Sequence, residues 1–405
     1  MSLKITKLVT LLLGIFLCVI FTILYQSKES DTYLAEEAEA CDAINIQQSL
    51  KIDCWMSIIQ ETFQESGTQG AFDDFIYIYT NFETFANTGC HKHAHRVGDL
   101  AFYYEYLSHG DLSLVEFPMN ATTCGYGFYH GFIEHLVQNT PTSKYVDEIC
   151  PYLTSTIKTV APAISQTCYH GAGHGFLIAQ ADVLIDPREW SIVNFITVPL
   201  QRCDSLLQST DSERKECYLG VFTVLTEWMF DNEYGLVYDR QYPYVHCDLL
   251  INPLHQEACY YETTQKFDYI SNYNLKNTKK LIESGDRADI EEHLYEIALT
   301  GFIQRDTGTD GLDFLHTCKE VFENEIAMCI RVVIGGLIEH GPAQIQYKQV
   351  NQFCSNKILS PDEKRICIDA YAHKLERFNT KDEIQNMCSE GYLMKDLCIA
   401  NFDSL

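Results

Sequence analysis

The sequence has few basic side chains, few prolines and no closely spaced cysteine pair. It has 29 basic residues against 56 acidic ones, which gives a formal net charge of −27. Nucleic-acid binding by counterion release needs a basic surface, so this charge excludes that class of partner. The absence of CxxC excludes the haem-attachment motif and argues against cysteine zinc sites. With only 10 prolines in 405 residues, the chain is suited to long helices.

Common catalytic motifs are also missing. The sequence contains no HExxH zinc-protease motif and no GxSxG nucleophile elbow. Two short glycine pairs, Gly125-x-Gly127 and Gly171-x-Gly173, lack the Lys-Ser/Thr partner and the strand-to-helix context of a phosphate loop. A function must therefore be sought in residues that recur along the chain.

One long apolar run stands near the N-terminus. Leu8 to Tyr25 contains 18 residues without a charge, about 27 Å as a helix and enough to cross a bilayer core. Lysines precede this run and acidic residues follow it, so the positive-inside rule leaves the rest of the chain outside the cytoplasm. We predict a cytoplasmic segment 1–7, a transmembrane signal anchor 8–25 and an acidic linker 26–40. The alternative is a cleaved signal peptide, with Ala38-Glu39-Ala40 as the small-x-small cleavage site.

The cysteines fall into successive pairs once Cys18, inside the apolar run, is set aside. A periplasmic, extracellular or lumenal location would be oxidising, so the other 16 cysteines predict eight disulfides. Buried free thiols are the main alternative. The predicted pairs are Cys41/Cys54, Cys90/Cys124, Cys150/Cys168, Cys203/Cys217, Cys247/Cys259, Cys318/Cys329, Cys354/Cys367 and Cys388/Cys398.

Alignment on the second cysteine of each pair reveals an internal repeat. A small residue often stands three places after that cysteine, as in Gly127, Gly171 and Gly220, where it would let helices approach closely. A cysteine-free copy has Ala298 in the cysteine position and Gly301 three places on. Successive units begin about 31 to 49 residues apart, the period of two-helix repeats. We therefore predict that residues 41–405 form one all-α domain of disulfide-stapled helical hairpins, arranged as a solenoid, toroid or bundle.

Histidines gather in the first of these units, between residues 91 and 174. They form pairs four residues apart that share a helix face: His91 with His95, continued by Asp99, and His170 with His174. His130 and Glu134 have the same spacing, and Glu227 holds the position of Glu134 in a later unit. Because stacked repeats place equivalent positions side by side, we expect these side chains to converge on one inner surface.

Imidazoles and carboxylates on facing helices are typical of a metal site in a helical bundle. We predict His91, His95, His130, His170 and His174 as metal ligands, with zinc, copper or iron as the ion. Glu134 or Glu227 would be the general base of a hydrolase, while a redox enzyme would use the same ligands. The alternatives are buried structural hydrogen bonding, binding of an organic ligand without metal, and a non-enzymatic repeat scaffold that binds a protein partner.

Overall fold

The structure, a computed structural model, describes residues 34–44, 48–86, 88–285, 287–305, 311–322, 325–340, 346–379 and 384. All regular secondary structure in these ranges is helical, which confirms the predicted all-α class. The predicted cytoplasmic segment 1–7, the transmembrane segment 8–25 and the Cys388/Cys398 pair lie outside the described residues. Within the described ranges, no helix combines the length and the apolar character needed to span a membrane.

The chain divides into two compact units, Met1–Phe85 and Ala86–Leu405. The described part of the first unit has a short helix over 34–42, followed by α2 (Gln48–Asn81) and α3 (Glu83–Ala86). Gly67 interrupts α2 with a φ of 73°, a left-handed conformation that glycine adopts readily. Thr62 Oγ1 donates to Asp74 Oδ2 across this break at 2.5 Å. The buried Trp55 indole fixes the first helix by donating to the Ala38 carbonyl at 3.0 Å.

The second unit is built mainly from helical hairpins. It opens with α4 (Cys90–Ala101), a π-helical turn (Phe102–Tyr106), α5 (Leu107–His109) and α6 (Gly127–Asn139). Two further helices, α11 (Pro253–Thr264) and α12 (Phe267–Ile270), lie midway along it. The hairpins, each with an outer helix followed by an inner one, are α7 (Ser143–Ile157) with α8 (Ile164–Val183), α9 (Ile192–Asp204) with α10 (Asp211–Asp231), α13 (Leu275–Glu283) with α14 (Glu291–Arg305), α15 (Leu312–Val321) with α16 (Ile326–His340), and α17 (Gln346–Cys354) with α18 (Pro361–Phe378).

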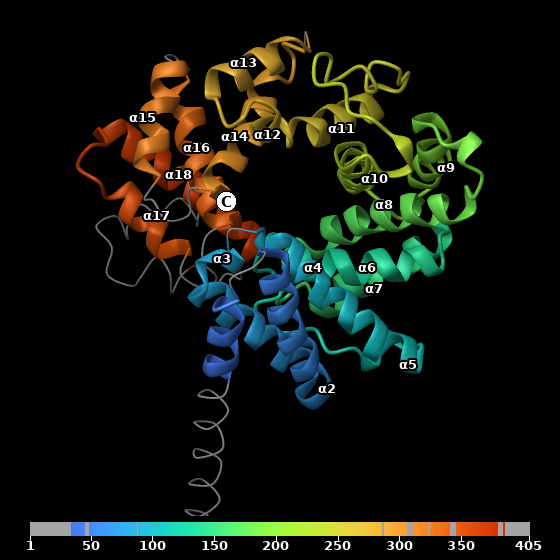
Figure 1. Cartoon of the computed structure of the whole chain (residues 1–405). Coiled ribbons are helices and arrows are strands. Elements are labelled where there is room, and N and C mark those ends of the chain that lie inside the picture. The colour runs from blue at the N-terminus through green and yellow to red at the C-terminus, as the bar shows by residue number, and fades with distance from the viewer. Residues whose placement is uncertain are drawn as a thin grey trace, which may run out of the picture. The chain divides into compact units, whose positions relative to one another are not determined.

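The inner helices of the second unit follow one another around a ring (Figure 1). In chain order α6 packs against α8, α8 against α10, α10 against α11, α11 against α14, α14 against α16, and α16 against α18. The ring closes where the end of α18 returns to the segment before α6. There Tyr126 Oη donates to the Arg377 carbonyl at 2.5 Å, and Thr122 Oγ1 donates to the Phe378 carbonyl at 3.0 Å.

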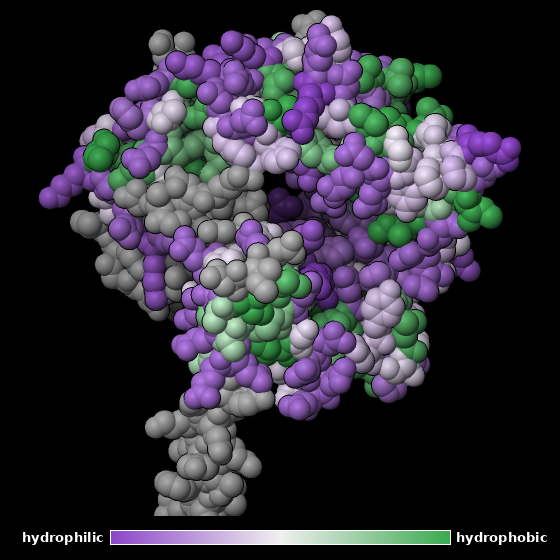
Figure 2. Space-filling model, in the orientation of Figure 1, coloured by the Kyte–Doolittle hydropathy of each residue, from purple (hydrophilic) through white to green (hydrophobic). Residues whose placement is uncertain are grey.

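This ring surrounds a cavity of about 720 Å³. The cavity is lined by residues of α6, α8, α10, α11, α12, α14, α16 and α18, including carboxylates, basic side chains and histidines. Figure 2 shows a recess with hydrophilic walls in this part of the second unit. A volume of this size can hold a small organic ligand, and a polar lining suits a charged one.

Disulfides join seven of the eight predicted cysteine pairs, which confirms that pattern: Cys41–Cys54, Cys90–Cys124, Cys150–Cys168, Cys203–Cys217, Cys247–Cys259, Cys318–Cys329 and Cys354–Cys367. Four of them join an outer helix to the inner helix that follows it. The cysteine-free copy is the α13–α14 hairpin, in which Ala298 is buried. In a chain-entropy account, each bridge with a loop near 12 residues contributes roughly 3 kcal/mol.

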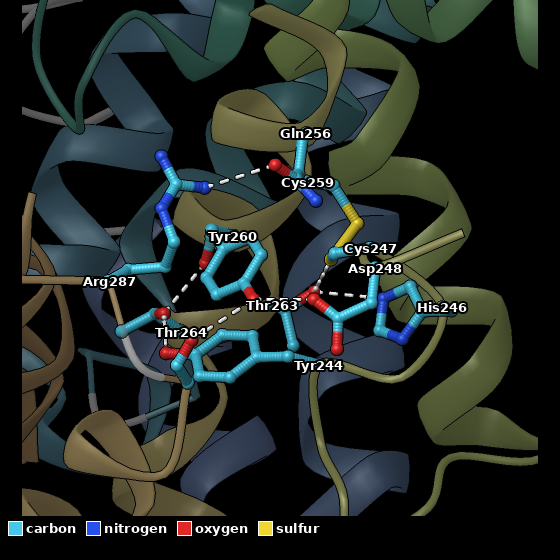
Figure 3. The surroundings of a disulfide bond; sticks show 11 residues. Tyr244, His246, Cys247, Asp248, Gln256, Cys259, Tyr260, Thr263, Thr264 and Arg287 are labelled. Carbon is cyan, nitrogen blue, oxygen red and sulfur yellow. Dashed lines mark hydrogen bonds between the residues drawn. A yellow bond between two sulfur atoms is a disulfide. The ribbon is translucent and has the colours of Figure 1, made fainter. Parts of the chain in front are cut away.

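The Cys247–Cys259 bridge, which joins the segment before α11 to α11 itself, is surrounded by hydrogen-bonded side chains (Figure 3). His246 Nε2 lies 2.9 Å from Thr263 Oγ1, and Tyr244 stacks on Tyr260 with ring centroids 4.2 Å apart. Although His246 is close to the sulfurs of Cys247 and Cys259, both sulfurs are bonded to each other. They therefore offer no thiolate to a metal ion, and this group is a structural staple.

Glycines bring the backbones of neighbouring inner helices into contact. A Cβ atom built on Gly220 of α10 would lie 2.0 Å from the His170 carbonyl oxygen of α8. A Cβ atom on Gly173 of α8 would lie 2.1 Å from the Cys217 carbonyl oxygen of α10. Real side chains do not reach such distances from backbone atoms, so only glycine permits this approach of α8 to α10.

We predict that Gly220→Ala destabilises the protein by about 1–3 kcal/mol or more, because backbone atoms cannot move aside. Gly335→Ala on α16 is the matched control, since its added methyl would meet only the flexible end of Lys374 at 3.4 Å. That substitution should leave stability unchanged or raise it by up to about 1 kcal/mol through helix propensity. Guanidinium denaturation with the disulfides intact measures both. Equal midpoints for the two variants would contradict the proposed backbone contact.

Candidate metal centre

Three neighbouring helices place the predicted histidines together. His91 and His95 lie on α4, His130 on α6, and His170 and His174 on α8. Glycine again allows the close approach of neighbouring helices. A Cβ atom on Gly131 of α6 would lie 2.2 Å from the His95 carbonyl oxygen of α4. With the backbones in contact, side chains at the same height on adjacent helices become neighbours.

The imidazole rings form a continuous group. Ring centroids are 4.9 Å apart for His91 and His130, 4.8 Å for His130 and His170, and 4.9 Å for His170 and His174. His95 lies 6.2 Å from His174 in a stacked arrangement. The expected convergence of these five histidines is therefore present, although proximity alone does not test their roles as ligands.

A buried carboxylate joins two histidines of this group. Glu134 Oε2 lies 3.2 Å from His95 Nε2 and 3.0 Å from His174 Nδ1. One donor atom from each of these three residues lies within 4.8 Å of the other two. The opposite ring nitrogen of His174, Nε2, is buried and has no hydrogen-bond partner among the residues that the structure describes. These groups could hold a metal ion.

Asp99 stands behind His95 and orients its ring. Its Oδ1 lies 3.3 Å from His95 Nδ1 and 3.3 Å from His135 Nε2. Burial acts to lower the pKa of His95, but its close contacts with the Asp99 and Glu134 carboxylates outweigh burial and raise that pKa to about 10. Burial acts to raise the pKa of Glu134, but its histidine partners hold it well below the usual range. A metal ion at this place would therefore compete with a proton on His95.

The surroundings of His91 and His130 favour the neutral form of both side chains. Burial lowers the pKa of His91 to about 3, and the positive charge of His95 adds to the shift. Burial, followed by the neighbouring histidines, holds the pKa of His130 well below its usual range. His91 Nδ1 donates to the Cys124 carbonyl at 2.9 Å, which leaves its Nε2 to accept from His130 Nδ1 at 3.1 Å. Neutral imidazole is the form that binds a metal.

Glu227 does not lie with this group. Its side chain is 57% exposed and its carboxylate is 3.6 Å from Lys266 Nζ. Among the described residues, no ion pair or hydrogen bond joins it to a histidine of the cluster. The expected match with Glu134 depended on equal spacing from the cysteine. Glu227 holds the equivalent place one inner helix further along. Glu134 on α6 contacts His174 on α8, whereas Glu227 on α10 contacts Lys266, which follows α11. The repeat position is therefore kept, but the next helix along carries no histidine of the cluster.

Two acidic residues near the cluster were not predicted. Glu216 Oε2 lies 3.5 Å from His170 Nδ1, and Glu262 of α11 is a buried residue that lines the cavity. Glu262 stands three places after Cys259, the position that glycine holds in the units of Gly127, Gly171 and Gly220. This departure from the repeat is the sequence feature that could have identified Glu262. Glu216, directly before Cys217, has no comparable feature in the sequence.

We predict that Glu262 makes stability depend on pH. Burial raises its pKa from 4.5 to about 8. The folded chain therefore holds this proton more tightly than the unfolded chain, and stability falls as pH rises through that window. Glu262→Gln removes the effect, so its stability relative to the native protein should increase by more than about 1 kcal/mol between about pH 5 and pH 9. Urea denaturation across pH measures this, with the exposed Glu227→Gln as control. Parallel curves for all three proteins would refute it.

No protein-family model, curated protein or solved structure matches this chain. The interpretation of the centre therefore depends on its own donor atoms and their surroundings. The donor atoms belong to two imidazoles and one carboxylate that lie close together. His91, His130 and His170, whose pKa values are lowered, lie beside them.

Proposed function

We propose that this chain is a membrane-anchored, extracytoplasmic metalloprotein that binds one transition-metal ion through His95, Glu134 and His174. His91, His130 and His170 would lie beside the ion and shape its access. The observation that carries the proposal is the convergence of the three donors around the buried Glu134 carboxylate.

The donor geometry supports this proposal. Ligand atoms at zinc-ligand distances of about 2.0–2.1 Å around a tetrahedral ion lie about 3.4 Å from each other. The separations of 3.2 Å and 3.0 Å from Glu134 Oε2 require only small movements to reach this value. The buried, unpartnered His174 Nε2 is a costly arrangement unless something binds there.

The three proposed ligands limit which metal ions and reactions are expected. Two histidines and one carboxylate bind zinc in hydrolases and iron in non-haem oxygenases. An ion held in this way would supply Lewis acidity and an activated water, or a redox centre. In this proposal Glu134 is a ligand rather than the general base. His130 and His170 line the cavity and would face a substrate there, while Asp99 fixes the ring of His95.

The compartment is part of the proposal. Seven disulfides indicate an oxidising environment. The apolar run from Leu8 to Tyr25, with lysines before it and acids after it, supports a signal anchor that leaves the ring outside the cytoplasm.

One observation favours a second candidate, a scaffold without metal. The raised pKa of His95 makes it a cation between the Asp99 and Glu134 carboxylates, so the same contacts also form a network of ion pairs that needs no metal. In that case the cluster would stabilise the stack of α4, α6 and α8, and the cavity would bind a partner directly.

Metal analysis separates the two candidates. We predict about one zinc or iron ion per purified full-length chain, and at least a tenfold loss of affinity in Glu134→Gln. Glu227→Gln is the matched control, because it makes the same change at the equivalent repeat position outside the cluster. It should retain the full metal content. An absorption spectrum distinguishes iron from colourless zinc.

If Glu134→Gln does not fold, the native protein still tests whether a metal ion is bound. Chelation should remove the ion and lower the melting temperature, and added metal should restore it. The metalloprotein proposal fails if the native protein holds no stoichiometric metal and takes up none when zinc or iron(II) is added.

A further inference from the structure

At one corner of the cavity, an arginine with a hydrogen-bonded backbone lies beside the two cluster histidines that line the cavity. We call it the Arg377 corner. It lies at the meeting point of α18, α6, α8 and α10. Its residues are Gly125, Tyr126, His130, His170, Glu216 and Arg377, and all six line the cavity.

Ring closure fixes the position of Arg377. Its carbonyl oxygen accepts a hydrogen bond from Tyr126 Oη at 2.5 Å, and Tyr126 Oη in turn accepts from the Ala163 amide at 2.9 Å. The Phe378 ring packs on Tyr126 with centroids 5.7 Å apart. These contacts hold the backbone of Arg377. Its exposed side chain lines the cavity, and its guanidinium carbon lies 5.9 Å from the centroid of the Phe378 ring.

Charge pairing distinguishes Arg377 from the other basic residues of the cavity. Arg331 Nε lies 2.5 Å from Glu296 Oε1, and Lys374 Nζ lies 2.8 Å from Glu339 Oε1. For Arg377, in contrast, the described part of the chain supplies no carboxylate within 4.0 Å. The positive charge of Arg377 nevertheless acts on a histidine of the cluster. Burial lowers the pKa of His170, and Arg377 adds to that shift.

The corner also contains open space and one acidic group. A Cβ atom built on Gly125 would have a single close neighbour, His91 Nδ1 at 3.4 Å. Glu216 is the acidic group, and its nearest partner is His170 Nδ1 at 3.5 Å. Burial acts to raise the pKa of Glu216, but its hydrogen bond to His170, with help from Arg377, holds that pKa below its usual range. Glu216 is thus engaged with His170, while the guanidinium fork faces the cavity.

We propose that the Arg377 corner binds an oxyanion, the carboxylate or phosphate group of a small ligand held in the cavity. A guanidinium presents parallel N–H donors that match the two oxygens of either group. The rest of the ligand would extend along the polar wall formed by α14 and α16. This inference goes beyond the metal proposal and does not require a bound ion, because the recognising group is an arginine.

Anion titration of the chelator-treated full-length protein tests the inference. Inorganic phosphate and acetate serve as separate probes, monitored by calorimetry. We expect one or both to bind, and Arg377→Gln to weaken that binding at least tenfold. Arg365→Gln is the matched control on the same helix, because Arg365 is 71% exposed and pairs with Asp362 outside the cavity. It should bind as the native protein does. A preference between the probes identifies phosphate or carboxylate as the recognised group.

A measurement on the native protein covers the case in which Arg377→Gln does not fold. Phenylglyoxal modifies accessible arginines, and mass spectrometry reports each site. The bound anion should slow modification of Arg377 severalfold and leave Arg365 unchanged. Absence of binding by both probes, equal affinity in Arg377→Gln, or unprotected Arg377 at saturating anion would each overturn the inference. Loss of metal in a separate experiment would not affect it.

Discussion

The arrangement of the second unit depends on backbone contact between adjacent inner helices. Gly220 and Gly173 bring α8 and α10 together, and Gly131 brings α6 against α4. Ordinary helix pairs keep their axes about 8–10 Å apart because side chains separate them. Where glycine removes the side chain, the neighbouring faces of the two helices almost touch. Imidazoles on those faces then stack at centroid distances below 5 Å, as His130 and His170 do.

Much of this fold could be predicted because the cysteines mark each repeat. Adjacent pairing of cysteines needs only local hairpins, so a recurring spacing is informative, and seven pairs occur as expected. Ala298 could be placed in the same way, since its segment keeps the apolar pattern without the bridge. The closure of the ring could not be predicted. It depends on a few contacts between Tyr126 and the end of α18 that leave no periodic signal in the sequence.

The candidate site could also be predicted only in the parts that follow the repeat. His91, His95, His130, His170 and His174 were found because helix periodicity and repeat position act together on them. Glu227 has the repeat position of Glu134, but it lies on α10 and pairs with Lys266 after α11, one inner helix beyond the cluster. Arg377 was missed for another reason. It belongs to the last hairpin and meets the first histidines only through ring closure.

The Tyr126 contact also has a consequence for how the molecule is made. Thr122 and Phe378, which take part in the same closure, are separated by 256 positions in the chain. During synthesis the helices that carry the histidines are complete long before α18 exists, so the cluster can form while one side of the cavity is still open to solvent. The ring of inner helices is complete only with the last hairpin. Contacts of such long range also form late in folding, because the entropy of closing the loop must be overcome first. A chain cut short before α18 would keep its histidines but lack the α18 wall of the cavity.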